Sequence, residues 1–466
     1  MILIYGIIQL FVLLLSYLIF TYIYKEEEKE IIDSKTNTNN LIEKKKKKIG
    51  LLTNEIPPII YGGVSTWIVN YIKMFEEDDN FEIIPIFLAY ADKDRIKEID
   101  GKYENLRIVY NKQDIINSFK DIDICVNNLW IALDTIKMIV DTYPEIIMIS
   151  VCHSLIKMEH LTNLGSMYTN NFYEQEITFQ CSDFVILISE AEKNYYITFG
   201  YNKYKAKPVV IYNSYKPKFD NIKLKINYKN NNIGYIGRHV PRKRPELPIF
   251  AVKKNKNKNV EVWNMGVDYK NGSNEYWDVL KELFKDQLNI IPFSSDKKLK
   301  KKFWNKVGVN CITGIYEPFG YTICETLDRR VPAIVQNIDG PKEIIGQFKN
   351  SVYMYEVEKN NWEKDINNVS DAMKKFWSTS PKNREINAEK ARKALDKFRP
   401  EAIKEKWKDL FSECLSDEYK NKRISNKKLK KFGKMLKISS YDCIPILKEY
   451  FKKIISPKKK SENNIN

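Results

Sequence analysis

Histidine and cysteine are scarce in this chain, which argues against a metal site and against a fold held by disulfides. The 466 residues include three His and seven Cys, and the Cys are odd in number and scattered without the spacing of a zinc site. Most of them lie in apolar stretches typical of a reduced core, which argues against a disulfide-stapled fold. No Asp-x-Asp motif stands where it would serve the ligand crevice predicted below. We therefore expect no metal site and no essential divalent ion.

Charge is missing altogether from residues 1–24. This apolar run is long enough to span a bilayer, and it lacks the basic start and small-residue cleavage site of a signal peptide. A buried core helix is the alternative, but the polar, basic linker at 25–48 argues against burial. Because Lys residues follow the run and none precedes it, the positive-inside rule predicts a single-pass membrane protein with its remaining domains in the cytosol.

The formal net charge of +17 is concentrated in two places. One is the run Lys44–Lys48, and the other is the tail at 419–466. No recognised nucleic-acid-binding motif accompanies them, so we expect no nucleic-acid partner. In the tail, lysines alternate with apolar residues, which suits either a surface that lies on anionic lipid or a solvated lysine-rich segment. Both interpretations stay open.

The rest of the sequence alternates between strand and helix patterns in two sets. The first set covers 49–220 and the second covers 221–398, which predicts an α/β protein with two doubly wound, Rossmann-like domains. A polar stretch rich in Lys and Asn, 216–231, is the predicted hinge. After the second set a helix is expected at 399–418, with apolar side chains on one face.

Two carboxylates in the second set stand eight positions apart. Glu317 follows an apolar strand pattern at 307–312, and Glu325 lies within a helical pattern at 320–327. Eight residues return close to the same helix face, so both side chains can point to the crevice at the strand's carboxyl end. Paired carboxylates suit hydroxyl-rich ligands such as a sugar or ribose. A helix whose first turn carries Glu to complement its dipole is the structural alternative.

A basic loop precedes this pair by about 80 residues. The strand pattern at 232–237 ends in Gly237, and Arg238, Lys243 and Pro245 follow before a helical pattern. Pro245 is expected in the first helical turn. A glycine-bounded loop at a helix N-terminus offers backbone N–H groups to a diphosphate, and the two cations add to that attraction. A solvated basic loop is the alternative.

The first set contributes two weaker signals. Gly62 and Gly63 stand between a strand pattern at 48–53 and an apolar helix pattern, where they would let a ligand approach the backbone, although a tight turn explains them as well. His153 follows the strand pattern at 147–152, again at a carboxyl end. Ser189 and Asn213 end later strand patterns and are expected to be mainly architectural.

Several of these elements occur in the order found in a known family. Glu317-Pro318-Phe319-Gly320, the second carboxylate Glu325, Pro332 before the next strand pattern, and Gly340-Pro341-Lys342-Glu343 resemble the signature of the retaining, GT-B fold glycosyltransferases of the glycogen-synthase-like family 4. The Gly237 loop resembles that family's Gly-Arg-x-x-x-x-Lys motif, and Gly62-Gly63 resembles its Gly-Gly loop.

The resemblance implies a fold, a reaction and a set of roles. It implies two Rossmann-like domains facing a cleft, and transfer of a sugar from a UDP- or GDP-linked donor, with retention of anomeric configuration, to a glycan, lipid or protein acceptor. Arg238 and Lys243 would hold the diphosphate, Glu325 the ribose, and Glu317 with His153 the sugar. Gly62, Gly63, Gly237, Phe319 and Gly320 would line the donor site. The helix at 399–418 would cross back to the first domain.

The chain also departs from that family. Arg330 stands where the family usually has Gly, and Asn264 replaces the first Gly of a Gly-x-Gly pair that ends at Gly266. These departures leave open a catalytically degenerate scaffold that binds nucleotide or sugar without turnover. A basic membrane-associated interaction protein is the other alternative.

Overall fold

The computed structural model of the chain describes residues 46–423, except 60–61, 90–92, 100, 130–132, 164–170, 223, 268–274, 293, 295 and 359–360. The predicted membrane anchor at 1–24 therefore lies outside the described residues, as do nearly all of the linker at 25–48 and most of the tail. Among the described residues, no helix combines the length and the apolar composition that crossing a membrane requires.

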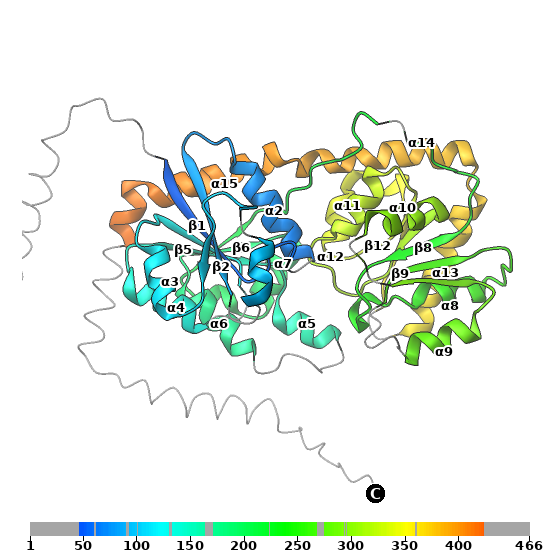
Figure 1. The fold of residues 1–466 in the computed structure, drawn as a ribbon. Helices are drawn as coiled ribbons and strands as arrows, with labels where there is room; N and C mark the ends of the chain where they lie inside the picture. The colour runs from blue at the N-terminus through cyan, green and yellow to red at the C-terminus, as the bar shows by residue number, and fades with distance from the viewer. Residues whose placement is uncertain are drawn as a thin grey trace, which may run out of the picture. The chain divides into compact units, whose positions relative to one another are not determined.

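The first domain, residues 47–210, is built on a parallel sheet of seven strands in the order β3-β2-β1-β4-β5-β6-β7 (Figure 1). Its central strands are rich in apolar residues and largely buried on both faces, as expected of a sheet that helices cover on each side, whereas the edge strands β3 and β7 are only partly buried. The strands are β1 (Lys47–Thr53), β2 (Phe81–Leu88), β3 (Arg107–Val109), β4 (Ile124–Asn127), β5 (Ile147–Cys152), β6 (Phe184–Leu187) and β7 (Lys207–Val210). The helices are α2 (Gly63–Phe75), α3 (Lys112–Phe119), α4 (Leu133–Thr142), α5 (Ile156–Thr162), α6 (Asn171–Cys181) and α7 (Glu190–Thr198), with 3-10 turns η1 (Lys93–Glu98) and η2 (Tyr201–Lys203).

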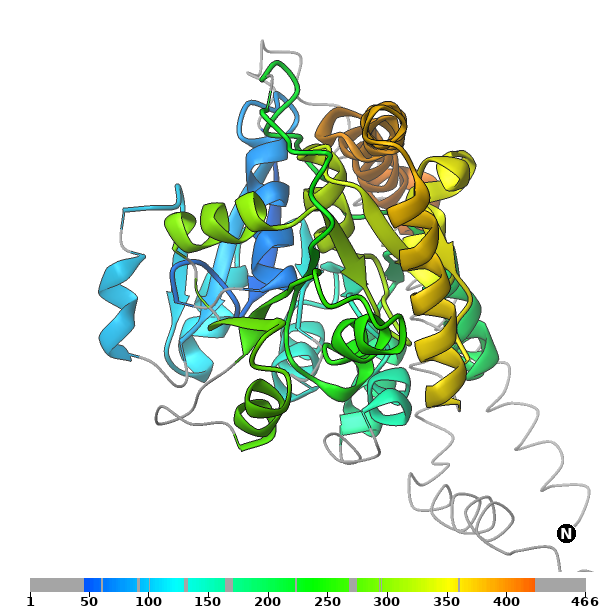
Figure 2. The ribbon, with the colours of Figure 1, turned by 90° about the vertical axis from the view of Figure 1, so that its right-hand side faces the viewer.

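The second domain, residues 233–378, repeats this arrangement with six parallel strands in the order β10-β9-β8-β11-β12-β13. Figure 2 looks onto this domain, with the first domain behind it. The strands are β8 (Ile233–Ile236), β9 (Val262–Val267), β10 (Leu288–Pro292), β11 (Val309–Ile312), β12 (Ala333–Gln336) and β13 (Tyr353–Tyr355). The helices are α8 (Leu247–Lys254), α9 (Glu275–Leu283), α10 (Lys297–Lys306), α11 (Tyr321–Asp328), α12 (Asp339–Ile345) and α13 (Trp362–Ser378), with turns η3 (Pro241–Lys243) and η4 (Gly346–Ser351).

In both sheets the strand order reverses next to the first strand of the domain, between β1 and β4 and between β8 and β11. Ligands of doubly wound sheets bind outside the carboxyl ends of the strands at such a reversal. The prediction of two doubly wound α/β domains is therefore confirmed. One local prediction is wrong: Pro245 precedes α8 rather than entering its first turn, because Arg244 before it adopts a left-handed backbone with φ +46° and breaks the helical path.

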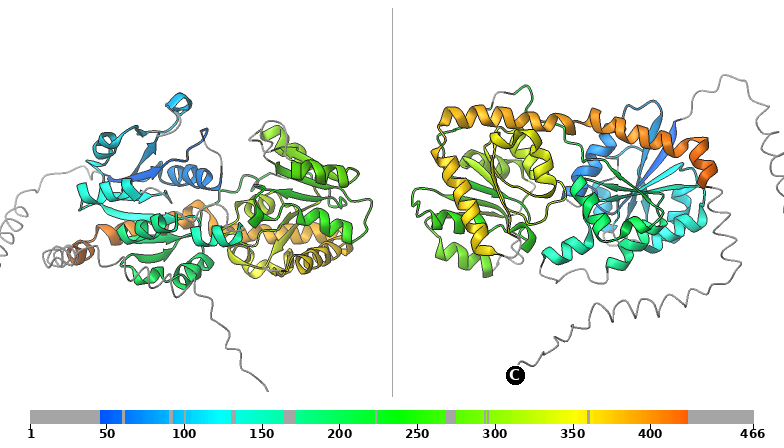
Figure 3. Two further views of the ribbon diagram at one scale, coloured as in Figure 1. Left: turned by 90° about the horizontal axis from the view of Figure 1, so that it is seen from below. Right: turned by 180° about the vertical axis from the view of Figure 1, so that it is seen from behind.

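Two segments cross between the domains, and Figure 3 shows them from below and from behind. Residues 211–232 lead from β7 to β8, and α14 (Pro381–Arg392), η5 (Lys393–Phe398) and α15 (Pro400–Leu415) lead back. α15 packs against α2 of the first domain, where Trp407 meets the edge of the Tyr71 ring, with ring centroids 5.1 Å apart.

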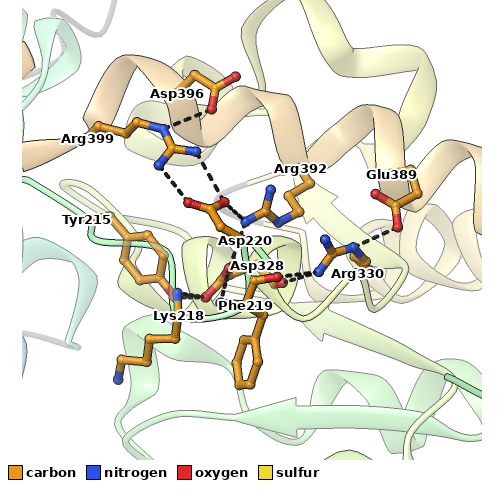
Figure 4. A network of polar contacts seen from close by, with 10 residues as sticks. All are labelled: Tyr215, Lys218, Phe219, Asp220, Asp328, Arg330, Glu389, Arg392, Asp396 and Arg399. Atoms are coloured by element: carbon orange, nitrogen blue, oxygen red, sulfur yellow. Dashed lines mark hydrogen bonds and ion pairs between the residues drawn. The ribbon is translucent and has the colours of Figure 1, made fainter. Parts of the chain in front are cut away.

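A cluster of charged groups ties these two crossing segments together (Figure 4). Asp220 in the outgoing segment pairs with Arg392 at the end of α14 and with Arg399, whose Nη1 is 2.7 Å from Asp220 Oδ2. Fully buried Asp328 at the end of α11 accepts hydrogen bonds from the backbone N–H of Lys218 at 2.7 Å and from Tyr215 Oη at 3.1 Å. We call these residues the hinge cluster.

Arg330 belongs to the same region, and its place explains the departure noted in the sequence. Its backbone is left-handed, with φ +57°, a conformation that glycine adopts most easily. Its side chain donates to the carbonyl of Phe219 at 3.0 Å and pairs with Glu389, with Nε and Oε1 2.7 Å apart. Arg330 thus holds the outgoing segment against α14 and lies at the hinge.

Candidate functional site

The predicted site residues all follow the carboxyl ends of parallel strands. Gly62 and Gly63 come after β1 and open α2, and His153 comes directly after β5. Gly237, Arg238 and Lys243 follow β8, while Glu317, Phe319 and Gly320 follow β11. Because β8 and β11 are the strands on either side of the reversal in the second sheet, the basic loop and the carboxylate loop lie next to each other.

Lys243 and Glu317 form an ion pair between these two loops, and both side chains are largely buried, with 17% and 15% of their surface exposed. Burial lowers the pKa of Lys243 to about 8, although the charge of Glu317 opposes that shift. Burial also acts to raise the pKa of Glu317, but Lys243 and Arg242 outweigh it and leave the pKa below its usual value. The pair is therefore charged at neutral pH.

Arg238 differs from Lys243 in exposure. The side chain of Arg238 is exposed, whereas that of Lys243 packs into the loop between β8 and α8. Glu55, after β1 in the first domain, lies close enough to Arg238 that the arginine lowers its pKa, while burial raises that pKa by more. A cation of the second domain thus faces a carboxylate of the first.

The loop that carries Glu317 is fixed by glycine contacts. Gly320 begins α11 with φ +116°, which a side chain would strain. A Cβ on Gly340 would lie 2.4 Å from the carbonyl oxygen of Phe319, so the two loops pack backbone against backbone. Phe319 itself is buried in the core. Its role in the structure is therefore packing, and Gly320 provides the turn that directs Glu317 and α11.

Glu325 is the fifth of the eight residues of α11 and is half-exposed. Its side chain makes no hydrogen bond to another residue within the described part of the chain, unlike that of Glu317. Both oxygens remain available to accept from hydroxyl groups of a ligand.

The loop after β8 touches strand β9 where Gly237 meets Gly266. Gly266 has φ +126°, and a Cβ there would lie 2.0 Å from the carbonyl oxygen of Gly237, so no other residue fits. Asn264, the departure noted in the sequence, is buried and donates from Nδ2 to the carbonyl of Pro245 at 2.8 Å. It holds the end of the basic loop, which is a structural role.

His153 approaches the site from the first domain. Its Nε2 bonds Asn128 Oδ1 after β4, and its ring meets the edge of Trp67, with centroids 5.1 Å apart. Burial lowers the pKa of His153 to about 3, so the ring is neutral at physiological pH. It can therefore donate or accept a hydrogen bond but does not supply positive charge.

Gly62 and Gly63, which follow β1, differ from Gly266 because a Cβ at either position would meet no close backbone atom. Gly62 has an extended backbone and donates its N–H to Ser65 Oγ at 2.6 Å, while a Cβ on Gly63 would meet open space. Packing alone does not demand glycine at 63, which is consistent with a backbone left bare for a ligand. Ser189 caps α7 by accepting from the N–H of Glu192 at 3.1 Å, the architectural role expected of it.

Several residues that sequence reasoning missed surround the predicted set. Asn128 orients His153, Glu55 faces Arg238, and Arg242 is almost wholly buried, with its Nη1 donating to the carbonyl of Tyr316 at 3.0 Å. The only sequence signal for these residues was a polar side chain soon after a strand, one position after β4 for Asn128 and two positions after β1 for Glu55. Among the described residues, no group of three or more His, Cys, Asp or Glu could hold a metal ion.

Comparison with known proteins agrees with this architecture. Residues 218–394 match the family model described as glycosyl transferases group 1. No curated protein sequence matches the chain. Among solved structures, sucrose-phosphate synthase from Thermosynechococcus elongatus is similar at 13% identity with a TM-score of 0.63, over 79% of this chain and 99% of that one.

Two further similar structures are complexes with ligands. Anabaena HepE in complex with UDP and glucose is 15% identical with a TM-score of 0.59, over 78% of this chain and 99% of that chain. A mutant of S. aureus TarM in complex with Fondaparinux, alpha-GlcNAc-glycerol and UDP is 14% identical with a TM-score of 0.58, over the same shares. At these identities the likeness establishes the fold. The chain thus has the two-domain GT-B fold of the glycogen-synthase-like glycosyltransferases, and residues 218–394, most of the second domain with its flanks, match the glycosyl transferases group 1 family model.

Proposed function

We propose that this protein transfers a sugar from a nucleotide-diphosphate sugar to a hydroxyl group of a glycan, lipid or protein acceptor, with retention of anomeric configuration. The observation that carries the proposal is the Lys243–Glu317 pair at the strand reversal of the second sheet, with Arg238 exposed beside it. A cation next to a carboxylate at this point suits a ligand that joins a diphosphate to a sugar.

The proposed roles follow from charge and exposure. Arg238 and Lys243 hold the diphosphate, and their positive charge stabilises it as it leaves. Glu325, free to accept hydrogen bonds, binds the ribose, while Glu317 and neutral His153 bind the sugar. Two protein cations at the diphosphate would supply the charge that a divalent ion supplies elsewhere, so we propose transfer without an essential metal.

The reaction exchanges one bond for another at the anomeric carbon. The bond between that carbon and the diphosphate oxygen breaks, and a bond to the acceptor oxygen forms on the same face of the sugar. The acceptor proton passes to the departing diphosphate. Because the new bond forms on the face that the diphosphate leaves, the anomeric configuration is unchanged. Because His153 stays neutral, we do not assign it the role of general acid.

The structural relatives give the order in which to test donors. HepE is described in complex with UDP-glucose, TarM with UDP, and starch synthase IV from Arabidopsis thaliana with ADP and acarbose. UDP-sugars are therefore the first donors to try, followed by ADP- and GDP-sugars.

A donor panel with the full-length protein tests the proposal. Release of nucleoside diphosphate from UDP-, ADP- and GDP-sugars is measured with and without EDTA, for the wild type and for Arg238→Ala. We expect release from at least one donor, insensitivity to EDTA, and a large loss in Arg238→Ala. Tight nucleotide binding without any release or transfer would instead identify a binding scaffold.

We also propose that residues 1–24 anchor the protein and that both domains face the cytosol, on the basis of the charge distribution alone. Extraction of the membrane fraction with alkaline carbonate, and protease treatment of sealed microsomes, test the two parts separately. Release by carbonate would contradict the anchor, and protection of the domains from protease would contradict the orientation.

A further inference from the structure

Glu317 is held from the first domain as well as from its own. Its backbone N–H donates to Asp339 Oδ2 at 3.3 Å, and Asp339 Oδ1 accepts from Tyr195 Oη of α7 at 2.8 Å. The carbonyl of Glu317 accepts from the N–H of Gly340 at 3.1 Å. The peptide of Glu317 is thus held on both sides by the start of α12, which is in turn bonded to a helix of the first domain.

The neighbouring Tyr316 makes a second connection. It is completely buried, and its ring packs in a hydrophobic cluster whose other buried members all belong to the first domain: Cys152, Leu155, Met158, Phe179, Val185, Leu187, Tyr196, Tyr201 and Ala206. Its hydroxyl accepts from the N–H of Leu155 at 3.0 Å and lies beside the buried carboxyl group of Glu192. The ring also meets the edge of Tyr195, with centroids 6.0 Å apart.

Helix α7 is fixed to α12 at its beginning as well. Glu343 Oε1 accepts from the N–H of Ala191 at 2.7 Å, and Glu343 Oε2 accepts from the N–H of Glu190 at 3.0 Å. A carboxylate at a helix N-terminus satisfies N–H groups that the helix leaves unpaired. These bonds set the distance between α7 and α12 and so bring Tyr195 to Asp339.

The backbone conformation of Asp339 is unusual and is explained by its position between Tyr195 and Glu317. Its backbone is left-handed, with φ +46°, although it is not glycine. Aspartate tolerates this region better than most residues but still at a cost, and residues kept there often serve a function. Here the conformation places one carboxylate between the hydroxyl of Tyr195 and the peptide of Glu317.

We propose that Tyr195 and Tyr316 are positioning residues for Glu317, through which α7 of the first domain aligns the carboxylate loop of the second. This inference rests on the proposed function, since it deepens the account of the same site. Its consequence is that Glu317 reaches its working position only while the two domains are in contact. The Glu317 carboxylate is then aligned when the two domains are in contact and misaligned when they separate.

The chain offers a matched pair of variants for the test. Tyr195→Phe removes the hydroxyl that bonds Asp339, and Tyr196→Phe removes a buried hydroxyl one residue away on α7 that has no hydrogen-bond partner among the described residues. Both variants keep the ring and the packing. A purely structural role for α7 predicts similar effects of the two changes, whereas a positioning role predicts different ones.

Full-length wild type and both variants are compared in turnover and in donor binding. We expect Tyr195→Phe to lower kcat by roughly 10- to 100-fold, as for small misplacements of reacting groups. The KM for donor and the Kd for free UDP should stay within about twofold, because the hydroxyl bonds Asp339 and is not among the groups assigned to donor binding. Tyr196→Phe should match the wild type in all three quantities. Equal kcat in Tyr195→Phe and Tyr196→Phe would overturn the inference.

Hydrogen–deuterium exchange gives a readout that needs no activity. Because the N–H of Glu317 bonds Asp339, deuterium uptake in a peptide covering 313–320 should be faster in Tyr195→Phe than in Tyr196→Phe. Unchanged uptake in Tyr195→Phe would contradict the positioning role even if the enzyme is active. If the wild type transfers no sugar from any donor, the proposed function fails, while faster uptake would still establish the connection from α7 to Glu317.

Discussion

Arg242 of the second domain forms an ion pair with Glu159 of the first, with Nε and Oε2 2.7 Å apart and only 5% and 12% of the two side chains exposed. The same guanidinium donates to the carbonyl of Tyr316, and the N–H of Arg242 donates to Asn163 Oδ1 at 3.2 Å. The residue directly before Lys243 is therefore an anchor to the other domain, while Lys243 itself faces Glu317.

Glu159→Gln tests the strength of that anchor. Removing one partner leaves a buried guanidinium uncompensated, and such changes typically destabilise by about 3–5 kcal/mol. We expect a clear fall in the melting temperature, measured by calorimetry. Asp371→Asn is the control, because its pair with Lys374 is 63% and 60% exposed and such pairs contribute little. Equal shifts in the two variants would mean that the buried pair contributes no more than an exposed one.

The two cations of the basic loop should respond differently to truncation. Arg238→Ala should slow transfer by roughly 10²–10³-fold, as for loss of one preorganised charge, without lowering stability, because the side chain is exposed. Lys243→Ala should also lose stability, since it leaves Glu317 buried without its partner. Parallel measurement of turnover and melting temperature separates the two effects. Near-normal turnover in Arg238→Ala would remove it from the diphosphate site.

The two carboxylates should separate binding from turnover. Glu317→Gln keeps the shape of the side chain but removes the charge beside Lys243, so we expect kcat to fall much more than donor affinity. Glu325→Gln should mainly weaken binding of free UDP, by about tenfold for one charge-assisted hydrogen bond. Calorimetric titration with UDP measures the second effect. Equal losses of UDP affinity in both variants would show that the roles are wrongly divided.

Much of the fold could be predicted because it is encoded locally. The apolar run at 147–152 and the alternation around it mark β5 and its helices, and the motif spacing places Glu317 at a strand end. In a doubly wound sheet, strand ends converge by topology, so the meeting of the β8 and β11 loops follows from strand order. The proximity of Lys243 and Glu317 could therefore be predicted from the sequence.

The contacts between the domains could not be predicted in the same way. Tyr195 and Asp339 are 144 positions apart, and neither stands in a motif; one is a tyrosine on a short helix and the other an aspartate before Gly340. The sequence shows Arg330 only as a departure from a glycine position, because it does not give the backbone angle at that residue. The partners of the Arg330 side chain also lie on segments distant in sequence. Single polar residues acquire such roles only through the packing of whole domains.

The buried carboxyl of Glu192 should make stability depend on pH. Burial raises its pKa from the usual 4.5 to about 8, while Tyr316 opposes that shift. Between these values the unfolded chain has released the proton and the folded chain keeps it, so the free energy of unfolding should fall as pH rises from about 4.5 to about 8. Glu192→Gln cannot ionise and should lack this fall. Melting temperatures of both proteins from pH 5 to pH 9 should therefore diverge in favour of the variant, and parallel curves would contradict the assignment.

Lys243 should set the alkaline limit of activity. Burial lowers its pKa to about 8 in the free enzyme, so the side chain is charged below that pH and loses its proton above it. Since the charge holds the departing diphosphate in the proposed mechanism, kcat/KM for the donor should fall as pH rises through about 8. Lys243→Arg keeps a cation at every accessible pH, because a guanidinium does not deprotonate in this range. Its pH profile should stay level above pH 8, whatever its absolute rate. A fall at the same pH in wild type and Lys243→Arg would assign the limit to another group and leave Lys243 without a titrating role.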